Sequence, residues 1–194
     1  MTASPTSRVK RYVFDLDGTL FDTEALIRRA YISAGVIMPY DAWGKPAREW
    51  LPEVAGDRWA SVHMRKNEIY LRLLKESPPE RSTAARAMID LSTRGCETFV
   101  LTGASRPATA QLLTGFQPYH FKLLGVGCSL PEKLHRVRVI GYPHEMVYVD
   151  NDDVACDAMA EIGCHVVRYK LNMMKEEVLQ QWEASSSLPA VASD

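Results

Sequence analysis

Two aspartates stand one residue apart at the end of an apolar stretch near the start of the chain. Asp15 and Asp17 occur in RYVFDLDGT, residues 11–19. Carboxylates this close repel each other and resist ionising together. A folded protein keeps such a pair when a divalent cation offsets the repulsion, and ligands that are all oxygen favour Mg²⁺. The pair therefore predicts a Mg²⁺ site.

Two later stretches place further polar groups after predicted strands. LTGAS, at 101–105, combines the Thr102 hydroxyl with a turn that contains Gly103, and Ser105 can cap the helix that follows. Backbone N–H groups at the start of a helix bind anions such as phosphate. VDNDD, at 149–153, forms a second acidic cluster. Because ligands of open parallel sheets bind at the carboxyl ends of the strands, we expect all three stretches to meet there.

A phosphate site beside a metal also needs a fixed positive charge. Lys133 lies at the start of the helix predicted before the strand at 146–150, so it can reach the same edge. Lys122 is a rival for this role, and we favour Lys133 because of its position.

Strands and helices alternate along most of the chain, which is typical of βαβ units and a parallel sheet. The exception is residues 23–80, where only helices are expected and 38–57 is broken by proline and glycine. The pattern predicts an α/β fold, a doubly wound parallel sheet with a small helical insertion after the first strand. The predicted strands are 11–16, 97–103, 121–127, 146–150 and 165–169, and the predicted helices are 22–35, 58–76, 81–95, 106–115, 130–141, 152–163 and 173–185.

We therefore divide the chain into a core, a helical insertion and two tails. The catalytic core covers residues 10–22 and 81–184, and the helical insertion covers 23–80. Residues 1–9 and 185–194 are expected to be flexible tails.

Composition narrows the class of protein. The chain has 194 residues, of which 46% are hydrophobic and 24% charged, with a net charge of −1. This balance gives no reason to expect a nucleic acid polymer or a membrane as partner. No apolar run suits a membrane span or a secretory signal, and the four cysteines fit neither a zinc site nor a disulfide framework. We expect a cytoplasmic protein with reduced thiols; the oligomeric state is not predicted.

Four ordered motifs resemble those of the haloacid dehalogenase (HAD) superfamily. They are DLDGT at 15–19, LTGAS at 101–105, Lys133 and VDNDD at 149–153. The resemblance implies a Rossmann-like core and a Mg²⁺-dependent phosphatase. Asp15 would be the nucleophile that forms an aspartyl-phosphate, and Asp17 the general acid and then the general base. An aspartate at the second position also favours phosphoryl transfer over cleavage of a carbon–halogen bond.

The resemblance also implies the ligands of the metal and of the phosphate. The Asp15 carboxylate and the Asp17 backbone carbonyl would bind Mg²⁺, while Thr102, Gly103 and Lys133 would hold the phosphoryl group. The fourth motif departs from the commonest form, because Asp150-Asn151 stands where many relatives have Gly-Asp or Asp-Asp. Asn151 then takes the usual ligand position, with Asp150 beside it, and the exact ligand set stays open.

The helical insertion resembles a small cap of the C1 type, which implies a small phosphorylated metabolite as substrate. In this insertion WGKPAREW, at 43–50, resembles the stretch that reaches the substrate, with Lys45 and Arg48 as candidate contacts. Candidate substrates are a sugar phosphate, phosphoglycolate or a nucleotide. Two alternatives stay open: a phosphomutase, or a non-catalytic binding protein on the same fold.

Overall fold

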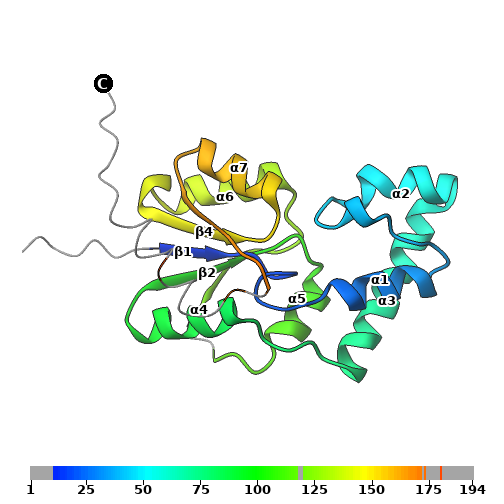
Figure 1. Cartoon of the computed structure of the whole chain (residues 1–194), viewed down its shortest axis with the longest axis horizontal. Coiled ribbons are helices and arrows are strands. Elements are labelled where there is room, and N and C mark those ends of the chain that lie inside the picture. Colours follow the sequence, from blue (N-terminus) through cyan, green and yellow to red (C-terminus); the bar gives the residue numbers. More distant parts are fainter. Residues whose placement is uncertain (1–10, 118–119, 172, 174–179, 181–194) are drawn as a thin grey trace, which may run out of the picture.

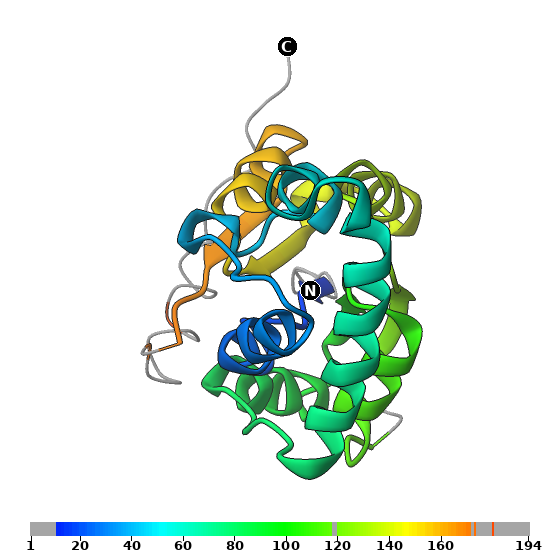
Figure 2. The same ribbon diagram turned by 90° about the vertical axis from the view of Figure 1, so that its right-hand side faces the viewer.

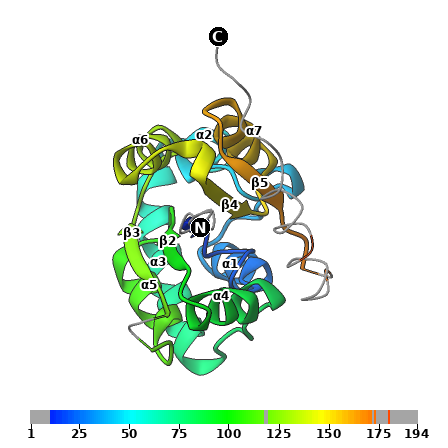
Figure 3. The same cartoon turned by 90° about the vertical axis from the view of Figure 1, so that its left-hand side faces the viewer.

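The computed structural model describes residues 11–117, 120–171, 173 and 180. Its centre is a sheet of five parallel strands in the order β3-β2-β1-β4-β5 (Figure 3). The strands are β1 (Arg11–Phe14), β2 (Glu97–Leu101), β3 (Lys122–Gly125), β4 (Met146–Asp150) and β5 (His165–Arg168). The predicted doubly wound parallel sheet is thus confirmed.

Helices cover both faces of this sheet. Figure 3 shows α6 (Leu130–Ile140) and α7 (Asp153–Glu161) on one face, and α4 (Thr83–Thr93) and α5 (Arg106–Leu113) on the other. The strands serve both faces because alternate side chains point in opposite directions. Val13 packs in the cluster on the α6 and α7 side, whereas Tyr12 and Phe14 pack in the cluster on the α4 and α5 side.

The strand order fixes where a site can form. The chain runs from β1 outward to β2 and β3, then returns to the other side of β1 for β4 and β5. β1 therefore lies at the point where the winding reverses, where open sheets bind their ligands. Because β2 and β4 both flank β1, the three predicted motifs at the ends of these strands become neighbours.

Residues between β1 and α4 form helices beyond the carboxyl ends of the strands. They are α1 (Glu24–Ser33), the 3-10 turn η1 (Tyr40–Ala42), α2 (Ala47–Ala55), the 3-10 turn η2 (Gly56–Arg58) and α3 (Trp59–Glu76). The β1 arrow points toward these helices in Figure 1, and α1 packs on α3. Pro52 lies inside α2, where it removes one helical donor while Trp50 and Leu51 beside it stay buried.

Several sequence predictions differ from the structure in their bounds or lie outside the described residues. The strand predicted at 11–16 ends at Phe14, because the chain turns back and the N–H groups of Leu20 and Phe21 both donate to the Leu16 carbonyl. The helix predicted at 173–185 and both predicted tails lie almost wholly outside the described residues.

A further 3-10 turn, η4 (Pro143–Glu145), precedes β4. No helix in the described part of the chain is long and apolar enough to cross a membrane.

Candidate active site

Asp15 and Asp17 lie on a tight loop directly after β1. The Asp15 N–H extends the sheet by donating to the Val149 carbonyl at 3.0 Å, which anchors the loop to β4. Gly18 then takes a positive φ of 79°, and its N–H donates to the Phe21 carbonyl at 2.7 Å. Glycine suits this position because a side chain is strained at such a φ. The turn leaves Asp15 buried and Asp17 half-buried.

Lys133 reaches the Asp15 carboxylate from α6. Its Nζ lies 2.6 Å from Asp15 Oδ1 and 3.4 Å from Asp150 Oδ2. A capping box places the lysine, since the Ser129 hydroxyl and N–H both donate to Glu132 at the start of α6. The rival Lys122 lies elsewhere and forms an exposed ion pair with Glu97 at 2.7 Å.

A buried tyrosine that the sequence analysis did not identify completes this cluster. The Tyr148 hydroxyl donates to Asp150 Oδ2 and lies 3.4 Å from Lys133 Nζ. Asp150 Oδ1 accepts from the Asp152 N–H at 3.0 Å. Both oxygens of Asp150 are therefore engaged within the protein. From the sequence, a tyrosine inside a strand is expected to pack in the hydrophobic core. Only the hydrogen bond of its hydroxyl to Asp150 identifies Tyr148 as part of the site.

The charges of this cluster do not balance within the protein. Burial raises the pKa of Asp15 to about 8, with Lys133 opposing this rise and Asp150 adding to it. Burial would lower the pKa of Lys133, but its anionic neighbours, Asp15 foremost, outweigh burial and raise it well above the usual value. One ammonium thus faces Asp15, Asp150 and the nearby Asp17. Such a site favours an additional cation.

The Asn151 side chain lies beside the Asp17 backbone carbonyl. Its amide lies over Gly18, where a Cβ would come within 2.6 Å of Asn151 Nδ2. Without a cation, the amide nitrogen donates to the Asp17 carbonyl at 3.0 Å and to Thr19 Oγ1 at 3.1 Å. The amide can also turn its oxygen inward, toward the Asp17 carbonyl oxygen 3.0 Å away, and adjacent oxygen ligands of octahedral Mg²⁺ lie about 3 Å apart. The donor set therefore fits Mg²⁺.

Side chains alone do not make the metal site. Among the described residues, no group of three or more histidine, cysteine, aspartate or glutamate side chains is arranged to hold a metal. A cation would depend on the Asp15 carboxylate, the Asp17 carbonyl and the Asn151 amide, with water and substrate supplying the rest. Mg²⁺ commonly binds in this way. The engaged oxygens of Asp150 favour Asn151 over Asp150 as a direct ligand.

Thr102 and Gly103 follow β2, the neighbour of β1. Thr102 is 1% exposed, and its hydroxyl accepts from the Ala104 N–H at 3.0 Å. Ser105 caps α5 by accepting from the Ala108 N–H. The backbone at 103–105 therefore presents the start of a helix at the same edge as Asp15, which suits an anion.

The two predicted substrate contacts of the helical insertion lie at its surface. Lys45 is exposed and forms an ion pair with Asp41 at 2.9 Å. Arg48 is exposed on α2 and faces Glu132 on α6, where its charge helps the hydrogen bonds from Ser129 to lower the pKa of Glu132. The structure does not bring either cation to the carboxylates, and their contact with a substrate stays a prediction.

Two other residues of the helical insertion do reach the loop after β1. The Tyr70 hydroxyl of α3 donates to Asp17 Oδ1 at 3.0 Å. Lys66, one turn earlier, is 9% exposed and its Nζ lies 5.1 Å and 5.2 Å from the ring centres of Tyr31 and Tyr70. The sequence analysis predicted only a helix at 58–76 and missed both residues. The signal it could have used is a lysine within the apolar face.

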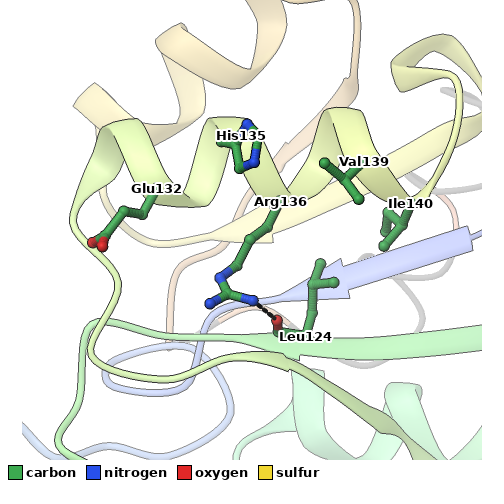
Figure 4. Close-up of a pocket in the computed structure, with 6 residues that line it drawn as sticks. All are labelled: Leu124, Glu132, His135, Arg136, Val139 and Ile140. Atoms are coloured by element: carbon green, nitrogen blue, oxygen red, sulfur yellow. Dashed lines mark hydrogen bonds between the residues drawn. The ribbon is translucent and has the colours of Figure 1, made fainter.

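A hollow of about 330 Å³ lies between β3 and α6, away from these carboxylates (Figure 4). In Figure 4 Arg136 crosses this hollow and donates to the Leu124 carbonyl at 2.9 Å. None of its lining residues belongs to the predicted motifs; they are Leu124, Glu132, His135, Arg136, Val139 and Ile140. We assign the hollow no role in the chemistry.

Comparison with solved structures identifies the fold. CbbY from Rhodobacter sphaeroides, crystallised with xylulose 1,5-bisphosphate, superposes with a TM-score of 0.68 at 19% identity, over 81% of this chain and 84% of CbbY. A haloacid dehalogenase-like hydrolase from Streptococcus pneumoniae gives a TM-score of 0.67 at 15% identity, over 89% of this chain and 90% of that one. The chain has the HAD fold.

A third HAD-fold neighbour is a phosphomutase. The β-phosphoglucomutase from Clostridium difficile gives a TM-score of 0.67 at 14% identity, over 91% of this chain and 98% of that one. No sequence profile of a known family matches the chain, and no curated protein matches it by sequence. At these identities the comparisons establish the fold, so the activity has to be argued from the site.

Proposed function

We propose that the protein is a Mg²⁺-dependent phosphatase of a small phosphomonoester. The observation that carries this proposal is the buried pair of Asp15 and Lys133, 2.6 Å apart, with the Asp17 carboxylate on the same loop. A nucleophilic carboxylate, a second carboxylate and a fixed cation are the groups that phosphoryl transfer through an aspartyl-phosphate requires. The HAD-fold neighbours include phosphatases and phosphomutases by name, which supports the same chemistry.

Each residue has a role that follows from its place. An Asp15 oxygen attacks phosphorus and the bond to the leaving oxygen breaks, while Asp17 gives that oxygen a proton. Asp17 then takes a proton from water, which attacks the aspartyl-phosphate and releases phosphate. Lys133, the Thr102 hydroxyl and the Gly103 N–H hold the phosphoryl oxygens throughout. Tyr70 orients Asp17 through its 3.0 Å hydrogen bond.

Mg²⁺ would supply charge neutralisation between the carboxylates and the phosphoryl group. Asp15, the Asp17 carbonyl and Asn151 would hold it. Without it, Asp15 and the incoming phosphate repel each other, so we expect removal of the metal to abolish turnover.

We also propose the division of labour between segments. Residues 10–22 and 81–184 form the catalytic core, and the helical insertion at 23–80 acts as a cap that closes over the substrate. Its support is the contact from Tyr70 to Asp17, which joins α3 of the insertion to the catalytic loop. A closed cap excludes bulk water and favours small substrates.

Within the cap, Lys66 is our candidate for binding the substrate beyond its reacting phosphate. Burial lowers its pKa, and the nearby Asp17 opposes that shift. Its only hydrogen bond in the described part of the chain goes to Asn67 Oδ1 at 3.3 Å, and no described carboxylate lies within ion-pair distance. A buried ammonium held mainly by two aromatic rings is costly, and an anionic or hydroxyl group of the substrate would satisfy it.

Replacing the Lys66 ammonium should weaken substrate binding without lowering the stability of the fold. We expect Lys66→Met to raise KM by about 10- to 100-fold, the value of a lost hydrogen bond to a charged group. The same change should raise the free energy of unfolding by about 1 kcal/mol, because it removes a desolvated charge without a partner ion. Arg65→Met, at the exposed neighbouring position, is the control and should change neither quantity. A Lys66→Met protein with unchanged KM and lower stability would show a purely structural lysine.

The proposed function is tested by measuring phosphate release from a panel of sugar phosphates, phosphoglycolate and nucleotides. Release with Mg²⁺ that stops with EDTA supports a phosphatase. Formation of an isomer without phosphate release would instead indicate a phosphomutase. This alternative is supported by the structural similarity to β-phosphoglucomutase. Binding of phosphorylated ligands without either product would indicate a binding protein.

A further inference from the structure

The loop that precedes α2 contacts the fourth motif of the core. Gly44 lies 3.5 Å from Asp152, measured from the position of an added Cβ to the Asp152 carboxyl carbon. Figure 2 shows this part of the helical insertion, in light blue, beside α7, in orange. Trp43, just before Gly44, is half-buried there. This loop thus meets the fourth motif through a glycine preceded by an indole.

The Trp43 indole and the metal site use the same amide. Asn151 has two orientations that differ by exchange of its oxygen and nitrogen. In the outward orientation its oxygen accepts from Trp43 Nε1–H at 3.3 Å, and its nitrogen donates to the Asp17 carbonyl at 3.0 Å and to Thr19 Oγ1 at 3.1 Å. In the inward orientation the oxygen faces the Asp17 carbonyl, as a shared cation requires.

The inward orientation leaves two donors face to face. The amide nitrogen then stands 3.3 Å from Trp43 Nε1, and both atoms carry hydrogens. Thr19 does not decide between the orientations, because its hydroxyl can donate to the oxygen or accept from the nitrogen. Without a cation, the Asp17 carbonyl and Trp43 therefore both favour the outward orientation. A cation between the Asn151 and Asp17 oxygens would reverse the preference of the Asp17 carbonyl, so that Trp43 would still oppose metal binding.

We infer that Trp43 of the helical insertion and Mg²⁺ compete for the Asn151 amide oxygen, so that metal loading loosens the insertion from the core. This inference rests on the proposed function, because it requires Mg²⁺ at Asn151. Trp43 acts through Asn151 and is a positioning residue. The competition is specific to asparagine. A carboxylate at 151 has two acceptor oxygens, so it can bind Mg²⁺ with one and accept from Trp43 with the other.

The consequence is an ordered opening. If the Asn151 oxygen turned inward to hold Mg²⁺, the Trp43 indole would lose its acceptor, and the loop at 43–44 would be released from the fourth motif. Trp43 thereby lowers the affinity for Mg²⁺ in the absence of substrate.

Isothermal titration of Mg²⁺ into four substrate-free proteins tests the competition: wild type, Trp43→Phe, Asn151→Asp and the double variant. We expect Trp43→Phe to tighten Mg²⁺ binding roughly two- to tenfold, the range of one net hydrogen bond. In the Asn151→Asp background the same change should give no tightening. Trp59→Phe, on α3 and 37% exposed, is the matched control and should bind Mg²⁺ as wild type does.

The indole N–H signal of Trp43 gives a second readout that does not depend on activity. Comparison of the ¹⁵N–¹H spectra of wild type and Trp43→Phe assigns the signal. We expect saturating Mg²⁺ to shift it upfield in wild type, as a lost acceptor requires, and to leave it in place in Asn151→Asp.

Each outcome bears on a different claim. An unshifted indole signal, an unchanged Mg²⁺ affinity in Trp43→Phe, or equal tightening in both backgrounds would overturn the competition and leave the proposed phosphatase intact. Wild type that binds no Mg²⁺ at all would overturn both.

Discussion

Asp15→Asn should reduce phosphate release by about 10⁴-fold or more, since it removes the nucleophile rather than a supporting contact. The amide is nearly the same size and can still meet Lys133, whose Nζ now lies 2.6 Å from Asp15 Oδ1. Binding of substrate should therefore largely persist while kcat falls. Single-turnover phosphate release from the best substrate of the panel measures this. Asp22→Asn, exposed a few residues further along, is the matched control and should keep full activity.

The same variant also checks that lost activity does not reflect unfolding. Burial first of all raises the pKa of Asp15 to about 8 in the folded protein, against about 4 for an unfolded chain. The folded state then holds a proton that the unfolded state releases, so without Mg²⁺ the free energy of unfolding falls as pH rises from about 4 to about 8. Asp15→Asn should flatten this part of the profile and be no less stable at pH 8. Chemical denaturation across this range, in EDTA, measures it. An active Asp15→Asn protein would contradict the assigned nucleophile.

The sequence predicted the fold and the site best where general rules of strand order and helix position apply. The alternation of strands and helices predicted the parallel sheet, and the strand ends predicted that residues at 15–19, 101–105 and 149–153 would share an edge. Both follow from general rules of chain winding, and the sheet order with β1 between β2 and β4 confirms them. Lys133 was favoured over Lys122 for the same positional reason, and the structure places Lys133 beside Asp15.

The contacts from the helical insertion could not be predicted in this way. Lys45 and Arg48 drew attention because they are cations in a loop-rich stretch, yet both lie at the surface. Lys66 and Tyr70 sit on the buried face of α3, where periodicity assigns every residue to packing. Which buried polar side chain points at the catalytic loop depends on how α3 docks against the core. That docking is a tertiary property which no window of the sequence contains.

Lys133→Met should be the most damaging change outside the nucleophile, because it acts on both catalysis and folding. The ammonium is shared between Asp15 and Asp150, and its side chain is only 11% exposed. Loss of this charge leaves the transferred phosphoryl group without its fixed cation, and we expect kcat to fall by about 10³-fold. It also removes the ammonium that lies beside the buried side chains of Asp15 and Asp150, which should lower the free energy of unfolding by about 3 kcal/mol. Phosphate release and urea denaturation measure the two effects.

The rival lysine provides the control for this variant. Lys122→Met removes an exposed ion pair with Glu97 and should change stability by less than about 1 kcal/mol with activity intact. Mg²⁺ should restore part of the stability lost in Lys133→Met, because the cation neutralises the carboxylates that the lysine left behind. It should not restore the rate, since the metal cannot also take the position of the ammonium at the phosphoryl oxygens. Equal losses of activity and stability in Lys133→Met and Lys122→Met would contradict a specific role of Lys133 beside Asp15.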